Sequence, residues 1–163
     1  MNIFVTSILP EEAATHLDDK RTNKMITESA QIICVALNNI SIPIPYKLTH
    51  VNHPVVKWAC SEHNLHWLIR YFYFLHKEWL RRGFKKHMAW KKMILPITEF
   101  YDIVCIMNIE LHEPDEFVNC AANASLNLNF KHLNTVDAYK QYLNARWSTD
   151  KITPRWTNSV RPF

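Results

Sequence analysis

Glycine is almost absent from this chain, in which Gly83 is the only glycine among 163 residues. A left-handed backbone is open to glycine at little cost and strains most other residues, so tight turns are scarce in such a chain. The scarcity excludes a glycine-rich phosphate-binding loop and disfavours β-hairpins with glycine turns. We therefore predict an all-α fold.

Apolar side chains recur at helical spacing in two long segments. One runs from about residue 19 to 37, and the other from about 64 to 82, where Gly83 suits the C-terminal cap. Pro10 and Pro54 each suit the first turn of a further helix, because proline lacks the N–H that a first turn leaves unpaired. The pattern predicts a compact helical domain.

The rest of the chain is less regular. Residues 2–6 are expected to be extended, and residues 93–107 to be helical with a proline near the start or at a kink. A short helix is expected within 117–133, and a longer one over 134–147 with Asn134 or Thr135 as N-cap. The tail beyond is expected to be coil. No repeat, low-complexity run or linker divides the chain, which predicts a single compact domain over residues 1–163.

The formal net charge is +4 with histidine neutral, and nine histidines add positive charge below neutral pH. This excess is compatible with DNA or a nucleotide as partner, and equally with a slightly basic protein that binds neither. The opening residues MNIFVTS lack the charged start of a signal peptide, and the four cysteines are widely separated, so we expect reduced thiols and a cytoplasmic protein. No apolar run is long enough to cross a membrane.

Glu28 lies at the edge of the apolar face of the first long helix, in the segment LDDKRTNKMITES. Lys24 precedes it by one helical turn and Arg21 by two. One interpretation is an ordinary surface ion pair with Lys24, worth roughly 0.3 kcal/mol to the helix. The other is a partly desolvated carboxylate beside a basic groove, placed for proton transfer or for stabilising positive charge.

The loop THVNHP carries His50, Asn52 and His53. Two histidines three residues apart would share a metal on a helix, but the loop is not expected to be helical, and no carboxylate or cysteine completes the ligand set. Contacts with a base or a phosphate suit these side chains better, and hydrogen bonds within the loop or at a helix cap suit them better still. We predict no metal and no organic cofactor.

A basic segment over residues 81–92 interleaves its cations with Phe84 and Trp90. The charges suit a nucleic-acid backbone and the aromatic rings suit a stacked base. The alternative is a solvated helix end whose cations are favoured by the helix macrodipole. The C-terminal part of the chain again combines cations with aromatic rings. These side chains could stack on bases or dock the tail against the protein, and they are Arg146, Trp147, Arg155, Trp156 and Arg161.

The order of these motifs resembles the pyrimidine-dimer DNA glycosylase family, the small all-α proteins of the endonuclease V type found in phages and bacteria. The resemblance rests on Leu17-Asp18…Glu28, then Asn52-His53-Pro54, then Arg82-Gly83-Phe84. It covers the chain as far as the basic segment, and beyond that only the aromatic and basic tail matches loosely.

The resemblance implies a DNA glycosylase and AP lyase that acts on damaged or modified pyrimidine nucleotides, in the host cytoplasm if a phage encodes it. Family members use the α-amino group of the first residue as nucleophile and a glutamate on the first long helix. Met1 and Glu28 would then be the catalytic pair. The residues expected to bind substrate are Asn2, Arg21, Lys24, His50, Asn52, His53, Arg82, Lys85 and Lys86.

One departure from the family leaves alternatives open. The family's nucleophile is a small residue exposed by removal of the initiator methionine, whereas Asn2 is bulky and favours retention of Met1. Either Met1 supplies the amine or the amine chemistry is lost. In the second case the chain would be a phage protein that binds nucleic acid or a nucleotide on the same scaffold without catalysis. A third reading is an interaction protein with no nucleic-acid role.

Overall fold

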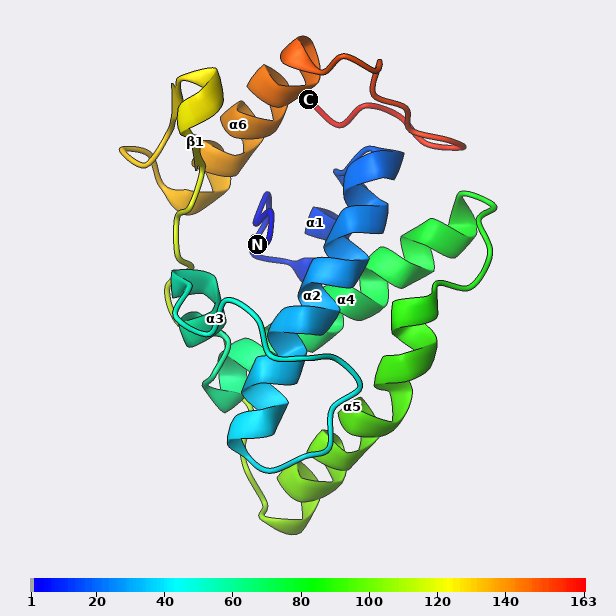
Figure 1. Ribbon diagram of the computed structural model, residues 1–163, viewed down its shortest axis with the longest axis vertical. Helices are drawn as coiled ribbons and strands as arrows, with labels where there is room; N and C mark the ends of the chain where they lie inside the picture. Colours follow the sequence, from blue (N-terminus) through cyan, green and yellow to red (C-terminus); the bar gives the residue numbers. More distant parts are fainter. Residues whose placement is uncertain (1) are drawn as a thin grey trace.

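Helix α2 (Asp19–Asn39) runs through the middle of the computed structural model, which describes residues 2–163 (Figure 1). Its N-terminus is capped by Asp18, whose side chain accepts a hydrogen bond from the backbone N–H of Arg21. One face of α2 is buried because its apolar residues recur at helical spacing. Helix α4 (Glu62–Arg81) packs against α2, and this pair forms the centre of the fold.

Within residues 2–163, four further helices lie around or beside the α2–α4 pair. Helix α1 (Pro10–Thr15) packs on α4, and α5 (Met88–Ile106) packs on α2 and α4. Helix α3 (Pro54–Trp58) begins at its proline, and α6 (Thr135–Thr149) is capped by Asn134. Pro96 lies inside α5. These bounds confirm the helices predicted from apolar spacing, and the all-α fold with them.

Residues 117–133 differ from the prediction, because the expected helix there is reduced to one turn. Strands β1 (Ala122–Asn123) and β2 (Leu128–Asn129) pair antiparallel, and the 3-10 turn η1 (Ala124–Leu126) connects them. Asn127 follows η1 with a φ of 52°, a left-handed conformation that asparagine tolerates better than most residues. Asparagine thus supplies the turn that the scarcity of glycine disfavoured.

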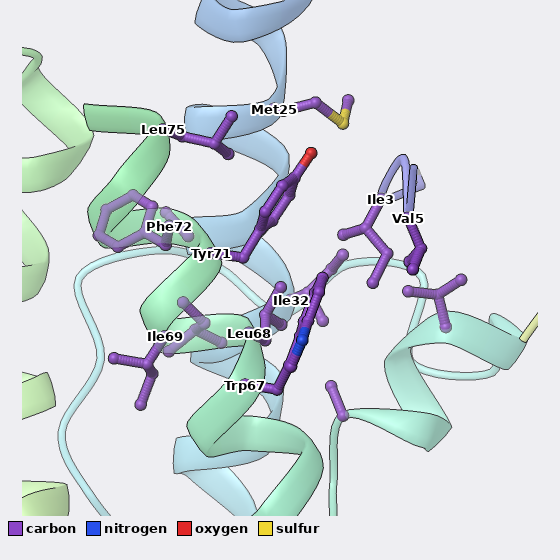
Figure 2. Close-up of a cluster of buried hydrophobic side chains, with 14 of the residues drawn as sticks. Ile3, Val5, Met25, Ile32, Trp67, Leu68, Ile69, Tyr71, Phe72 and Leu75 are labelled. Carbon is purple, nitrogen blue, oxygen red and sulfur yellow. The ribbon is translucent and has the colours of Figure 1, made fainter. Parts of the chain in front are cut away.

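The first residues that the structure describes are part of the core. They form neither strand nor helix, and the Thr6 N–H donates to the carbonyl of Phe4 at 3.0 Å, a tight turn within the segment that was predicted to be extended. Ile3 and Val5 belong to the same buried cluster as Trp67 and Tyr71 of α4 (Figure 2). The Tyr71 hydroxyl donates to the carbonyl of Phe4 at 3.4 Å, and the Trp67 indole N–H donates to the carbonyl of Ile8 at 2.7 Å. Apolar burial and these hydrogen bonds fix the first described residues in one place.

The tail after α6 is coil, as predicted, and lies across the N-terminal end of α2 (Figure 1). The backbone N–H of Asp19 donates to the carbonyl of Arg155 at 2.8 Å. Trp147 and Trp156 meet edge to face with ring centroids 5.0 Å apart, and the Arg161 guanidinium lies 5.3 Å from the Trp147 ring centroid. Docking is therefore the arrangement found for the aromatic and basic tail.

None of the helices within residues 2–163 combines the length and the apolar character needed to cross a membrane.

Candidate active site

Glu28 touches the first residue that the structure describes. The backbone N–H of Asn2 donates a hydrogen bond of 3.1 Å to Glu28 Oε2. Helix α2 places Glu28 at the edge of its buried face, where 15% of the side chain remains exposed. A largely desolvated carboxylate therefore faces the start of the chain, and it can stabilise positive charge that develops there. Met1, the predicted nucleophile, lies outside the described residues.

Lys24 approaches the other oxygen of the same carboxylate. Its Nζ lies 3.5 Å from Glu28 Oε1, and 60% of the lysine side chain is exposed. The ordinary i, i+4 pair considered from the sequence is thus present. It occupies only Oε1 and leaves Oε2 to the Asn2 N–H, so the surface ion pair does not account for the whole carboxylate.

The Asn2 side chain is held by a residue that the sequence analysis missed. The Tyr139 hydroxyl of α6 donates to Asn2 Oδ1 at 2.7 Å, across 137 positions of the chain. The backbone N–H of Ile3 also donates to this oxygen, at 2.9 Å. No sequence signal pointed to Tyr139, because it is one of several aromatic residues on α6 and α6 was assigned no role in the site.

His53 lies within electrostatic reach of Glu28. Burial lowers the pKa of His53, the neighbouring His50 lowers it further, and Glu28 opposes the shift. As the N-cap of α3, its Nδ1 accepts a hydrogen bond of 3.3 Å from the backbone N–H of Val55. An imidazole that accepts at Nδ1 and is neutral carries its proton on Nε2. His53 is thus a neutral ring with one N–H free to donate, and the predicted capping role is observed.

The two other residues of this loop are exposed. His50 has a left-handed φ of 54°, which is uncommon for a residue with a side chain and costs backbone energy. Asn52 is exposed beside it. The loop therefore offers polar groups to solvent next to the half-buried His53.

Arg21 and Arg82 are buried in ion pairs, which corrects the expectation that they contact DNA. Arg21 bonds Asp18 at 2.6 Å and Asp150 at 2.8 Å. Arg82, with no exposed side-chain surface, bonds Glu78 at 2.8 Å. A phosphate contact requires an accessible guanidinium, so both arginines are assigned to the stability of the fold.

The basic segment is divided between exposed cations and docked aromatic rings. Lys85 and Lys86 are exposed. Phe84 stacks on Trp79 with ring centroids 3.9 Å apart, and Trp90 stacks on His76 at 4.6 Å. The lysines can reach a phosphate, whereas one face of each predicted stacking ring is already covered.

His87 joins the basic segment to the site helix. Its Nδ1 accepts from the N–H of Ala89 and caps α5, and its Nε2 lies 2.9 Å from Asn23 Oδ1 on α2. Asn23 precedes Glu28 by five positions, or about 7.5 Å along the helix axis. The basic segment therefore meets α2 at Asn23, the residue before Lys24.

The side chains of residues 2–163 include no group of three or more histidine, cysteine, aspartate or glutamate residues arranged to hold a metal ion.

Comparison with known proteins gives one match. The family model described as pyrimidine dimer DNA glycosylase matches residues 1–92, more than half of the 163 residues. No curated protein and no solved structure matches the chain. The matched residues contain Glu28, Asn2 and the loop of His53, the elements that meet at the site described above. On this evidence the chain belongs to the pyrimidine dimer DNA glycosylase family.

Proposed function

We propose that the protein is a DNA glycosylase and AP lyase that acts on damaged or modified pyrimidine nucleotides, with an amine at the start of the chain as nucleophile and Glu28 as its carboxylate partner. One observation supports this assignment above all others. The Asn2 nitrogen lies 3.1 Å from Glu28 Oε2, so the chain's beginning and the helix glutamate meet. Family membership supplies the reaction class.

The proposed reaction begins with the α-amino group of Met1, whose carbonyl carbon is bonded to the Asn2 nitrogen. An α-amine has a pKa near ~7.7–8.0 in model peptides, so a useful fraction is unprotonated near neutral pH. It attacks C1′ of the target nucleotide as the glycosidic bond breaks, and the base leaves with the bonding electrons. The nitrogen passes one proton to the departing base and a second to O4′ as the C1′–O4′ bond opens, which gives the imine, or Schiff base, at C1′.

Glu28 serves both halves of this reaction. Its carboxylate stabilises the cation-like sugar while the base departs. It then assists removal of a C2′ proton, and the electrons of that C–H bond expel the 3′ phosphate and cut the strand. Only 15% of the side chain is exposed, and electrostatic stabilisation is stronger where water is excluded.

DNA contacts are assigned to the exposed groups around this carboxylate. Lys24 and the pair Lys85–Lys86 would bind the backbone, and the loop of His50, Asn52 and His53 would meet the sugar or the extruded nucleotide. The neutral His53 offers its Nε2–H as a donor to an oxygen of the nucleotide.

The test traps the Schiff base. The protein is incubated with duplex DNA that contains an abasic site, borohydride is added, and a covalent adduct is sought by gel and by mass spectrometry. The N-terminal residue is identified by mass spectrometry first, and peptide mapping must place the adduct on that residue. An adduct at any other position, or none, would overturn the proposal.

The substitution Glu28→Gln tests the carboxylate. Glutamine keeps an oxygen that can accept from the Asn2 N–H but carries no charge, so base release should be lost while DNA binding stays within about twofold. The control is Glu99→Gln, a charge loss at an exposed position of α5. Normal cleavage by Glu28→Gln would show that the assignment is wrong.

The bulky Asn2 favours a second candidate, a phage protein that binds nucleic acid or a nucleotide without catalysis. The same experiment separates the two. Salt-dependent DNA binding with no borohydride adduct supports the binding protein, and an adduct supports the lyase.

A further inference from the structure

We propose that Tyr139 is a positioning residue, whose hydroxyl holds Asn2 so that the start of the chain stays against Glu28. The inference rests on the proposed function, which uses an amine at that end of the chain. Tyr139 lies on α6, outside the residues 1–92 that match the family. The part of the chain beyond the match would then complete the active site.

The hydrogen bonds around the Tyr139 hydroxyl are fixed in direction. Its oxygen accepts from the backbone N–H of Cys120 at 3.2 Å, and that group can only donate. The hydroxyl proton is therefore free to point at Asn2 Oδ1, 2.7 Å away. The Ile3 N–H donates to the same Asn2 oxygen at 2.9 Å. Two donors converge on this atom, which identifies it as the amide oxygen rather than the nitrogen.

The support behind Tyr139 is rigid. The residue has no exposed surface, and its ring meets Phe4 edge to face with centroids 5.8 Å apart. Burial raises the pKa of its phenol well above the usual range, so the hydroxyl stays protonated and remains a donor. Phe4 belongs to the same buried N-terminal segment as Ile3. Residue 2 is thus held by its own side chain and by the segment that follows it.

The functional consequence follows from the geometry of residue 2. Its side chain is anchored by Tyr139, and its backbone nitrogen is the atom that meets Glu28. Without the Tyr139 donor, the Asn2 side chain can rotate, and the backbone to which the proposed amine is attached is no longer held against Glu28. A misplacement of about 1 Å at a reacting group can cost as much as ~100-fold in rate. Tyr139 is buried and does not reach DNA, so binding should not change.

The experiment compares Tyr139→Phe with Tyr142→Phe. Tyr142 is a buried neighbour on α6 that stacks on Phe4, and its hydroxyl has no hydrogen-bond partner among residues 2–163. Each variant is mixed with saturating abasic-site DNA, and the rate of borohydride trapping is measured beside the dissociation constant. Tyr139→Phe should trap about 10- to 100-fold more slowly at unchanged affinity. Tyr142→Phe should match the wild-type protein.

A second variant tests the same hydrogen bond from its other end. Asn2→Leu removes the acceptor and keeps a large second residue, so processing of Met1 should be unchanged. It should slow trapping by a similar factor, and adding Tyr139→Phe to it should cause no further loss, because the two changes remove one interaction. If Tyr139→Phe fails to fold, the trapping rate of Asn2→Leu alone tests whether this hydrogen bond positions the start of the chain.

The outcomes separate the two proposals. Adduct formation by the wild-type protein with an unaffected Tyr139→Phe variant would overturn the positioning role and leave the lyase intact. Additive losses in the double variant would also overturn the positioning role. Absence of any wild-type adduct would overturn the lyase itself and remove the basis of the inference.

Discussion

Glu28 has two partners, and they act on different properties of the protein. Asn2 binds one carboxylate oxygen through its backbone, and Lys24 lies near the other with most of its side chain in solvent. An exposed ion pair contributes little to stability, because water and salt screen it. Lys24 is therefore better understood as an accessible charge beside the carboxylate that we propose to be catalytic than as a structural element.

The substitution Lys24→Ala should separate these two roles. We expect the free energy of unfolding to change by less than about 0.5 kcal/mol, since the lysine end of the pair lies in solvent. DNA affinity should fall, and the slope of log K against log salt should decrease by about one unit if one phosphate contact is lost. Urea denaturation and salt-titrated binding measure the two effects. The exposed Lys77 of α4 is the control, and an equal loss for Lys77→Ala would contradict the role of Lys24.

The interface between α4 and α5 contains a histidine that the function does not use. His76 is 4% exposed, stacks on Trp90, and has a buried Nε2 with no hydrogen-bond partner among residues 2–163. Burial, together with the nearby charges of His87 and Lys86, lowers its pKa to about 4. At a pH between 6.5 and about 4, His76 is therefore neutral in the folded protein but protonated in the unfolded chain, where its pKa has the ordinary value of 6.5.

This difference makes stability depend on pH in a defined window. Because the unfolded state binds more protons between pH 6.5 and about 4, the free energy of unfolding should fall as the pH is lowered through that range. His76→Phe keeps a ring on Trp90 and removes both the titration and the unpaired nitrogen. We expect it to flatten the pH dependence and to stabilise the protein by about 1–2 kcal/mol at pH 5. Urea denaturation across this range is the measurement, with the exposed His132→Gln as control. An unchanged pH dependence in His76→Phe would refute this account.

The helices could be predicted because their signals are local. Apolar spacing, Pro10, Pro54 and the Asn134 cap all act within a few residues, and the helices were found near their predicted positions. The exception is the start of α5, which begins at Met88 and so takes in part of the basic segment that precedes the predicted start at residue 93. The unit at 117–133 could not be predicted in the same way. Its strands have two residues each, and its turn depends on the left-handed conformation of Asn127 rather than on a glycine.

The residues of the site likewise include some that local sequence signals predict and some that they do not. Glu28 and the His53 cap were predictable, because one is set by helix periodicity and the other by a loop that precedes a proline. Tyr139 was not, since its contact with Asn2 joins the two ends of the sequence. Arg21 and Arg82 were predicted to be accessible cations although each has a carboxylate partner within about one helical turn, Asp18 and Glu78. The burial that removes them from DNA also depends on Asp150 and Asp19, which lie far away in the chain and could not be assigned from local spacing.

The two ends of the molecule are joined at the N-terminus of α2. The Asp18 carboxylate bonds Arg21 on its own helix, and its Oδ2 also accepts from the Trp147 indole of α6 at 2.7 Å. Asp150 binds the other side of the Arg21 guanidinium. This buried network links the family-matched residues 1–92 to α6 and the tail, so the stability of both parts is coupled.

The substitution Asp18→Asn should expose that coupling. Asparagine is as good an N-cap as aspartate, so the cap of α2 survives and the loss reports the buried charge. Removing one partner of a buried ion network costs about 3–5 kcal/mol, although Asp150 still faces Arg21 and should hold the cost near the lower figure. Urea denaturation measures the loss, and Asp102→Asn, at an exposed position of α5, is the control.

The tail should also become easier to cleave in limited proteolysis, because Trp147 loses the acceptor that holds α6 to α2. A variant as stable and as resistant to protease as the wild-type protein would mean that apolar packing alone joins the two parts.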